Sequence, residues 1–464
     1  MQPTAIDFAR SYLPESPVAL EPARRPGYPV VGVLPDLRRD PLNFFVETVR
    51  DWGDIVELKF GIEKVLMVSR PDYIRHIVQD NRENYHKSKF VQLLSPILGD
   101  GMFLAEGEIW KSQRQCSAPA FQGCQLKAMT GHMRDATADL IYRWRQKELR
   151  AQPVAIVPEM MRLSLDMVLR SLFNVRLDQE FSEIYDALTT ILTDTEERFW
   201  SYLSLPRWMP TPHNLRFRQA LQVLDDFVYG IIEERRRNPQ GHSDLLTLLL
   251  AAAERQPSSK AGDKLLRDQV LSIILAGHDT TANSLAWSWI LLSRHADVAS
   301  RLKEEVDRVL GPRLLSFEDV PQLTYTKMVF DEVLRLYPPL WTFSRTAQAD
   351  DRLGAHRIPK GTNVMLCAYA VHRRPSLWSN PEGFDPERFN PGKTPEHDRF
   401  AYIPFGGGPR RCLGARFAAL EATIALSMIA QVFRLELVPG QRIEAEPMIT
   451  LRPSDDARMV LRAA

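Results

Sequence analysis

Apolar residues recur at helical spacing in three long stretches of the chain. In residues 130–150 and 217–237, apolar side chains fall three or four positions apart, which predicts amphipathic helices. The longest such pattern covers residues 263–295 and, at about 1.5 Å per residue, would extend roughly 50 Å. The pattern therefore predicts one helix long enough to cross a whole domain.

Alternation of apolar and polar positions predicts several short strands. Residues 54–60 and 64–68 alternate on either side of Gly61, which is typical of two strands joined by a turn. Three later segments have the same pattern: 363–368, 433–437 and 459–461. Long helices with a few short strands predict a mainly α protein with small β-sheets, in the α+β class.

The ends of these elements bear on the domain organisation. Residues 1–35 form a proline-containing lead-in that is expected to be extended, and residues 256–263 are expected to form a polar loop before the longest helix. A length of 464 residues would suggest two or three domains of about 150 residues each. The chain has neither an internal repeat nor a linker rich in glycine or serine, so we predict a single domain over 1–464.

Composition excludes some classes of function. Hydrophobic residues make up 44% of the chain, enough for a large core, and the net charge of +1 gives no support for nucleic-acid binding. Charged residues interrupt positions 1–25, whereas a spanning helix needs about 20 nearly continuous apolar residues. The four cysteines have neither metal-site spacing nor disulfide density. These features predict a cytoplasmic protein, most simply bacterial, without a membrane anchor.

One segment near the end of the chain indicates chemistry. It reads Phe405-Gly406-Gly407-Gly408-Pro409-Arg410-Arg411-Cys412-Leu413-Gly414 and leads into an apolar helix pattern. Nearby arginines and a helix N-terminus lower a thiol pKa, and the glycines permit positive φ and close approach to a bound group. The alternatives are a buried structural cysteine and a phosphate-binding loop, although the Lys-Ser/Thr that completes a phosphate loop is missing.

The middle of the longest helix contains poor helix formers. Gly277 and the threonines at 280 and 281 lower helix stability there. Ala276 and Thr280 share one face, and the Thr280 hydroxyl can bond back to the Ala276 carbonyl and open the helix locally. The alternative is a simple packing bend. His278 lies off this face, so we expect a packing residue rather than a ligand.

A third motif combines Glu332 and Arg335, three residues apart on a predicted helix, with Arg388 in a later segment. Taken alone, the first two residues would form an ordinary surface ion pair, which contributes less than about 1 kcal/mol.

The ten-residue segment ending at Gly414 resembles the haem-ligand loop of the cytochrome P450 family of haem-thiolate monooxygenases, and the resemblance extends over nearly the whole chain. It implies a triangular, helix-rich single domain with haem b between the long central helix and this loop. It also implies that Cys412 is the iron ligand. Further cofactor contacts are implied at these positions: Phe405, Gly406, Gly414, Ala276 and Gly277.

The resemblance implies roles for the remaining motifs. Thr280 would position oxygen and a water, and Asp279 would relay protons. Glu332, Arg335 and Arg388 would form a buried structural triad. The residues expected to contact the haem propionates are Trp110, Arg114, Arg345 and Arg410.

The implied activity is a monooxygenase that hydroxylates or epoxidises a hydrophobic small molecule, such as a fatty acid, terpenoid, steroid or polyketide. Electrons would come from a ferredoxin or flavodoxin with its reductase. The expected docking surface is basic: Arg411, Arg416, Arg373, Arg374 and Lys111. The expected substrate pocket includes Phe90, Met102, Trp341 and Ile449. The alternatives are a peroxide-using or electron-independent haem-thiolate enzyme and a non-catalytic haem-binding sensor.

Overall fold

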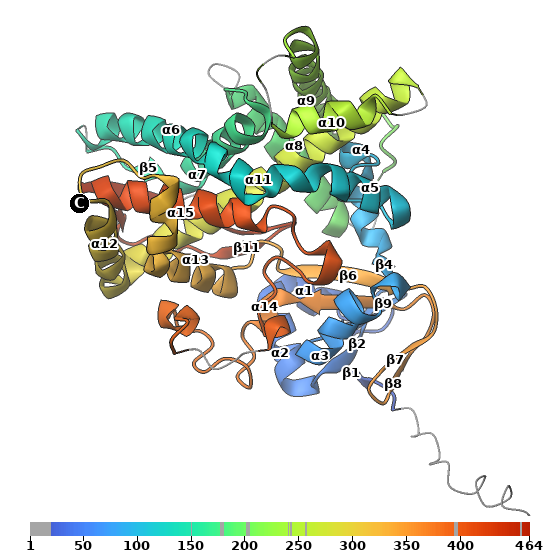
Figure 1. Cartoon of the computed structure of the whole chain (residues 1–464). Coiled ribbons are helices and arrows are strands. Elements are labelled where there is room, and N and C mark those ends of the chain that lie inside the picture. The colour runs from blue at the N-terminus through green and yellow to red at the C-terminus, as the bar shows by residue number, and fades with distance from the viewer. Residues whose placement is uncertain are drawn as a thin grey trace, which may run out of the picture.

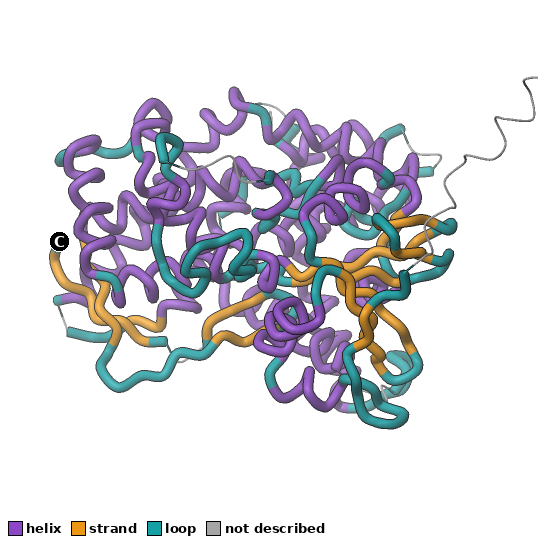
Figure 2. The backbone as a smooth tube through the Cα atoms, turned by 90° about the horizontal axis from the view of Figure 1, so that it is seen from below, coloured by secondary structure: helices purple, strands orange, loops and turns teal. Residues whose placement is uncertain are grey.

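The computed structural model describes residues 20–149, 151–176, 181–200, 205–239, 241, 244–255, 258–393, 398–454 and 457–464. Long helices fill most of the molecule, and the strands gather at its edges (Figures 1 and 2). The α-helices of the described part are, in chain order, α1 (Leu34–Arg39), α2 (Pro41–Trp52), α3 (Pro71–Arg75), α4 (Ser95–Leu98), α5 (Gly107–Ser117), α6 (Gly123–Glu148), α7 (Ile156–Val168), α8 (Phe181–Trp200), α9 (Pro212–Arg237), α10 (Leu245–Ala253), α11 (Ser259–Arg294), α12 (Ala296–Leu310), α13 (Thr324–Leu336), α14 (Ala368–Val371) and α15 (Ala415–Val432).

The larger sheet has the strand order β1-β2-β3-β9-β6-β4, and its strands are β1 (Ala23–Arg24), β2 (Ile55–Phe60), β3 (Glu63–Val68), β4 (Tyr85–Lys87), β6 (Thr342–Ala347) and β9 (Asn363–Cys367). The remaining strands are β5 (Val154–Ala155), β7 (Asp351–Leu353), β8 (His356–Ile358), β10 (Phe433–Leu437), β11 (Ala445–Pro447), β12 (Leu451–Pro453) and β13 (Arg458–Ala463). They form a three-stranded sheet, β10-β13-β5, and two hairpins, β7-β8 and β11-β12. This architecture confirms the predicted mainly α fold with small sheets.

The predicted hairpin is present, with β2 and β3 paired antiparallel across Gly61, where φ is +60°. The predicted helices begin earlier than expected. In particular, α11 begins at Ser259 because the Ser258 hydroxyl caps it by accepting a hydrogen bond from the Ala261 amide at 3.3 Å. The second half of the predicted 256–263 loop is therefore helical, and Gln256 and Pro257 lie outside the described residues. In the lead-in, residues 1–19 also lie outside them, and the rest contains β1 and the first residues of α1.

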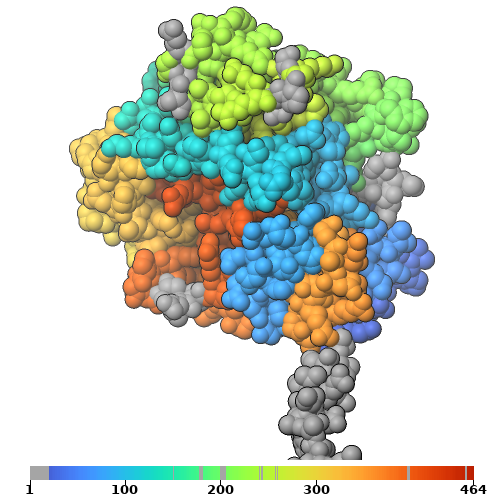
Figure 3. All heavy atoms as spheres, turned by 45° about the vertical axis from the view of Figure 1, so that its right-hand side comes forward, coloured from blue at the N-terminus to red at the C-terminus, as the bar shows by residue number. Residues whose placement is uncertain are grey.

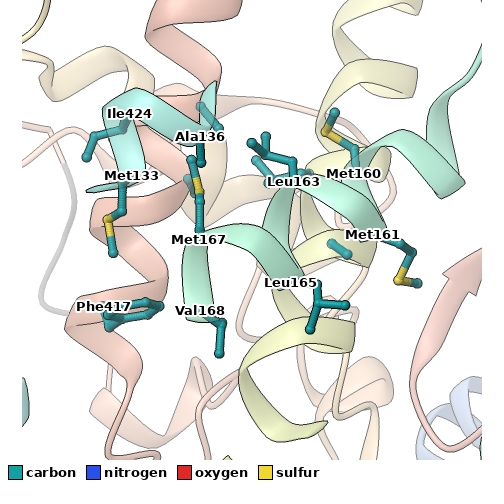
Figure 4. Packing of buried hydrophobic residues seen from close by; sticks show 14 of the residues in the cluster. Met133, Ala136, Met160, Met161, Leu163, Leu165, Met167, Val168, Phe417 and Ile424 are labelled. Atoms are coloured by element: carbon teal, nitrogen blue, oxygen red, sulfur yellow. The ribbon is translucent and has the colours of Figure 1, made fainter. Parts of the chain in front are cut away.

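The main hydrophobic core joins α6, α7, α11 and α15. Figure 4 shows Met133 and Ala136 of α6, Met167 of α7 and Phe417 of α15 in one cluster. These side chains are at most 3% exposed, and burial of apolar area at this level is the dominant favourable contribution to folding. The core fixes α15, which follows Cys412, against α6 and α11.

Among the described residues, α15 is the one helix long and apolar enough to cross a bilayer, with a mean hydropathy of 1.3. Most of it, 72%, is buried against the rest of the protein. The core helix of a water-soluble protein has the same length and composition, so this pattern is weak evidence for a membrane span.

Candidate active site

Cys412 lies in a tight loop immediately before α15. The Cys412 amide donates to the Phe405 carbonyl at 2.9 Å, and the Gly406 amide donates to the Ile403 carbonyl at 3.0 Å. Gly414 is the N-cap residue of α15, and a Cβ added there would lie 3.9 Å from the cysteine Sγ. The loop therefore holds the thiol at the helix entrance, as the sequence predicts.

Two glycines in the loop adopt the predicted left-handed conformation, with φ of +68° at Gly406 and +62° at Gly408. A Cβ at Gly408 would lie 1.9 Å from the carbonyl oxygen of Val78, and one at Gly407 would lie 2.9 Å from the Phe400 ring. Only Gly406 has open space beside it. At Gly407 and Gly408 the loop backbone therefore lies close to other parts of the protein, and it packs against the 76–80 segment.

The thiol pKa of Cys412 differs from expectation. Its side chain is accessible, yet it lies deep enough that burial raises its pKa above the usual value. The Gly414 amide and the charges of Arg114 and Arg411 lower it but do not outweigh burial. The predicted net lowering by cations and the helix N-terminus is therefore wrong for the free thiol. A bound metal ion would reverse the balance, because coordination deprotonates a thiol.

The middle of α11 has one accessible face. Residues 266–275 and 281–292 are buried, whereas Ala276 is exposed and Gly277 and Thr280 are partly accessible. The Thr280 Oγ1 donates to the Ala276 carbonyl at 2.8 Å, as predicted, but α11 continues without a break. His278 is 1% exposed, which confirms a packing position. The three accessible positions share one helix face, which carries small and polar side chains.

Asp279, the neighbour of Thr280 on α11, is buried, with 7% of its surface exposed. Its Oδ2 accepts a hydrogen bond from Thr450 Oγ1 at 2.5 Å. Burial raises the pKa of the Asp279 carboxyl, while the hydrogen bond from Thr450 and the charge of Arg452 oppose the rise. The acid is therefore next to Thr280 in sequence but anchored by a segment far along the chain.

The predicted propionate-contacting residues Trp110, Arg114 and Arg410 do converge beside the cysteine loop. The Arg410 guanidinium lies 4.2 Å from the centre of the Trp110 ring, and Arg114 donates to the Arg411 carbonyl at 2.9 Å. Arg410 also forms an ion pair with Glu106. The pocket here includes Trp110, Lys111, Arg345, Arg410, Glu106, Gly107, Ile77, Val78, Arg82, Glu83, Tyr85 and His86.

Lys87 joins this cluster and was not predicted. It lies directly opposite Arg345 in the β4–β6 pairing, although like charges opposite one another destabilise a sheet. Burial and the charges of Arg410 and Arg345 lower the pKa of Lys87 to about 7. Burial and the charge of Arg410 lower the pKa of Arg345 to about 10. Strand β4 is only three residues long, so its alternation pattern could not identify Lys87 from the sequence.

Arg345 and Arg410, with the partly charged Lys87, lie partly buried here, and Glu106 and Glu83 are the nearby carboxylates. The same cationic groups would offer charge-assisted hydrogen bonds to a ligand bearing carboxylates. Haem carries two propionates, and its iron requires a ligand such as the accessible thiol of Cys412. The residues present therefore fit a haem whose iron would be held by Cys412 and whose propionates would be held by this cluster.

The predicted triad is confirmed. Arg335 and Glu332 are both 0% exposed, and two guanidinium nitrogens bond the carboxylate at 2.7 and 2.8 Å. Arg388 donates to Glu332 Oε1 at 3.2 Å. Arg335 also donates to the carbonyls of His372, Pro381 and Gly383 at 2.7–2.9 Å. The triad thus fixes the irregular segment between α14 and the cysteine loop.

His372 connects the triad to the segment before the cysteine loop, and the sequence did not predict this role. Its Nδ1 lies 3.1 Å from the Arg335 carbonyl oxygen, and its Nε2 accepts a hydrogen bond from the Ile403 amide at 2.9 Å. Burial and the neighbouring arginines lower the pKa of His372 to about 3, so the ring is neutral. Both partners are more than 30 residues away, so no local pattern in the sequence identifies the role of His372.

Glu421 is a second buried carboxyl that the sequence did not reveal. It lies on α15, is 0% exposed, and burial raises its pKa to about 8. Ser164 and Thr281 lower the pKa, but among the described residues neither carboxyl oxygen has a partner in full hydrogen-bond geometry. Glu421 is therefore protonated and uncharged near neutral pH.

Glu421→Gln is expected to change how stability depends on pH. The folded chain keeps a proton that the unfolded chain, with a pKa of 4.5, releases, so the free energy of unfolding falls from about pH 5 to about pH 8. The variant should flatten this slope and be a few kcal/mol more stable than the wild type at pH 8, since one pKa unit is worth about 1.4 kcal/mol. Denaturant unfolding at several pH values measures the free energy of unfolding of both proteins. The exposed Glu304→Gln is the control, and an unchanged slope in Glu421→Gln would contradict the assignment.

The tentative pocket residues are not equivalent. The structure does not support Trp341 as a pocket residue, because it is 5% exposed and belongs to a core cluster. Its ring centre lies 5.9 Å from that of Phe45, and its Nε1 donates to the Met448 carbonyl at 2.8 Å. Phe90, Met102 and Ile449 are partly accessible, so their place in a pocket stays a prediction.

The predicted basic docking surface is reduced by the structure. Arg373 is buried, stacks 3.6 Å from the Tyr369 ring centre and pairs with Glu382, because it belongs to the segment held by the triad. Arg374 pairs with Asp54 at 2.5 Å, and Lys111 pairs with Glu108 at 2.6 Å. The exposed cations that remain are Arg411 and Arg416. In Figure 3 the C-terminal part of the chain, drawn in red, reaches the surface between segments drawn in cyan and blue.

The helix-rich fold and an accessible cysteine in a glycine-rich loop at the start of a core helix are typical of haem-thiolate proteins. Residues 22–457 match the family model described as Cytochrome P450, and the chain belongs to this family. The chain is therefore a cytochrome P450 monooxygenase, and membership implies a haem cofactor.

Relatives with curated names support this class. The chain is 32% identical to cyclooctatin synthase of Streptomyces melanosporofaciens over 92% of both chains. It is 33% identical to cyclooctat-9-en-7-ol 5-monooxygenase of the same organism over 89% of both. It is 32% identical to pentalenene oxygenase of Streptomyces avermitilis over 94% of this chain and 96% of the relative.

Proposed function

We propose that this protein binds haem b through Cys412 and inserts one oxygen atom of O2 into a terpenoid hydrocarbon or terpenoid alcohol. The observation that carries the proposal is the accessible Cys412 thiol in the glycine-rich loop before α15, next to the cationic cluster around Arg410. Names such as pentalenene oxygenase and cyclooctat-9-en-7-ol 5-monooxygenase among the relatives support this substrate class. A thiolate-bound haem supplies the oxygen-activating chemistry.

The chain's own residues would hold the cofactor. Arg114, Arg345 and Arg410, with Lys87, would bind the propionates, and Trp110 would pack beside Arg410. Phe405, Gly406 and Gly414 would shape the cysteine side, and Ala276 and Gly277 the opposite side. Small side chains at 276 and 277 leave α11 free to approach a flat group closely.

The experiment has two parts. Reduced, carbon monoxide-bound protein is expected to show the Soret band of thiolate-ligated haem. A panel of terpenoids, fatty acids, steroids and polyketides is then screened for shifts in the haem spin state, followed by turnover with a surrogate ferredoxin system. Tight binding and oxidation confined to another panel class would overturn the substrate class. Product formed only with added peroxide would favour the peroxide-using alternative.

Thr280→Ala is expected to waste reducing equivalents as peroxide. The hydroxyl would hold a water for proton delivery, and the neighbouring Asp279 would hold the proton. We expect product per O2 to fall several-fold while O2 consumption continues, measured as peroxide and product in one assay. Thr137→Ala, which removes the same kind of bond in α6, is the control. Unchanged coupling in Thr280→Ala would count against its role.

We also propose a cytoplasmic location in a bacterium, one catalytic unit over 1–464, and electron supply by a separate ferredoxin or flavodoxin with its reductase. All four cysteine thiols are free in the structure, which is compatible with a reducing compartment. The exposed Arg411 and Arg416 beside the cysteine loop would attract an acidic electron donor.

A further inference from the structure

The Asp279 carboxyl is held by the hairpin β11–β12 rather than by its own helix alone. Thr450, in the turn of this hairpin, donates from Oγ1 to Asp279 Oδ2 at 2.5 Å. The same hydroxyl accepts a hydrogen bond from Asn283 Nδ2 at 3.1 Å. A hydroxyl has one proton to donate, so accepting from Asn283 directs that proton toward Asp279.

The side chains around this contact range from buried to partly accessible. Asn283 is 0% exposed, lies one helical turn beyond Asp279 on α11, and also lowers the pKa of the Asp279 carboxyl through a side-chain hydrogen bond. Arg452 of β12 is the charged group that acts on the Asp279 carboxyl, and it pairs with Glu446 of β11 at 3.0 Å. An interaction with a buried carboxyl is strong in such surroundings, and loss of a donor there is correspondingly costly.

The same short turn also borders the predicted pocket. The Met448 carbonyl accepts the Trp341 indole N–H, and the Leu451 amide donates to the Pro339 carbonyl at 2.9 Å. Ile449, a predicted pocket residue, lies between Met448 and Thr450 in the chain. The turn at 448–450 therefore connects a predicted substrate-facing segment with the acid beside Thr280.

We propose that Thr450 is a positioning residue for proton delivery, which fixes the Asp279 carboxyl beside Thr280 and couples it to the hairpin β11–β12. The inference rests on the role of Asp279 in the proposed function. A valine at 450 keeps the shape but removes the donor, so the carboxyl keeps Asn283 and loses its bond to the hairpin. A serine at 450 keeps the hydroxyl.

The first test is coupling in the haem-loaded enzyme, measured as peroxide formed per O2. Thr450→Val is expected to raise this ratio several-fold, toward that of Asp279→Asn, and Thr450→Ser is expected to restore it. Ser454→Ala, which removes another hydroxyl bond of the hairpin (Glu444 amide to Ser454 Oγ, 3.4 Å), should not change it. Wild-type coupling in Thr450→Val, or uncoupling in Ser454→Ala, would overturn the proposal.

The second test needs no turnover. The infrared band of the protonated Asp279 carboxyl, assigned by its loss in Asp279→Asn, is followed against pH. Removing the Thr450 donor should raise the midpoint of this titration, whereas Thr450→Ser should leave it near that of the wild type. An unmoved midpoint in Thr450→Val would overturn the contact. If the midpoint moves but Asp279→Asn remains fully coupled, then the role of Asp279 in the proposed function fails while the contact stands.

Discussion

Arg335→Ala is expected to destabilise the fold by roughly 3–5 kcal/mol, the cost of leaving a buried charge without its partner. Glu332 would remain at 0% exposure with Arg388 as its remaining ion-pair partner, and the carbonyls of Pro381 and Gly383 would lose their donor. Because these contacts fix His372 and through it Ile403, the cysteine loop should loosen as well. Denaturant unfolding and the haem content of purified protein measure both effects.

Two further variants sharpen this result. Arg335→Lys keeps the positive charge but not the planar fork of donors. It should therefore lose most of the stabilisation that Arg335 contributes. Arg357→Ala removes an exposed arginine whose pair with Asp350 lies on the surface, and it should change stability by less than about 1 kcal/mol. Normal stability and haem content in Arg335→Ala would refute the structural role of the triad.

Cys412→Ser is expected to abolish thiolate ligation almost completely. The alcohol of serine does not ionise near neutral pH, so the loop would present no anionic sulfur to a metal ion. We expect purified protein with little haem, no thiolate-type band after reduction with carbon monoxide, and no product. Pyridine haemochrome content and the carbon monoxide difference spectrum measure this.

Cys124→Ser is the matched control, because Cys124 is also free and exposed but lies at the start of α6. It should load haem like the wild type. A thiolate-type spectrum in Cys412→Ser, or its loss in Cys124→Ser, would contradict Cys412 as the ligand. Burial raises the pKa of the free thiol, and coordination to a metal ion would deprotonate it.

Much of the site could be predicted because its motifs are local. The cysteine loop and the Ala276–Thr281 segment each lie within ten residues, and helical spacing alone places Ala276 and Thr280 on one face. The Glu332–Arg335 pair is also local. Its burial, and the joining of Arg388, came from the family resemblance and are confirmed by the structure.

The errors share one physical cause, since burial depends on packing between distant segments. The thiol pKa of Cys412 rises because surrounding protein removes solvent, which outweighs the cations visible in the sequence. Trp341 has the composition of a pocket residue but packs against Phe45 of α2. Arg373 has the composition of a surface cation but stacks on Tyr369.

The sequence by itself determined the helix-rich class, the position of the longest helix and the identity of the cysteine loop, because these follow from periodicity and short motifs. Only the tertiary structure decided which polar groups meet without a local motif: Lys87 opposite Arg345, His372 against the Ile403 amide, and Thr450 on Asp279. Each of these contacts joins segments separated by more than 30 residues, and their meeting depends on how the core packs rather than on any nearby pattern.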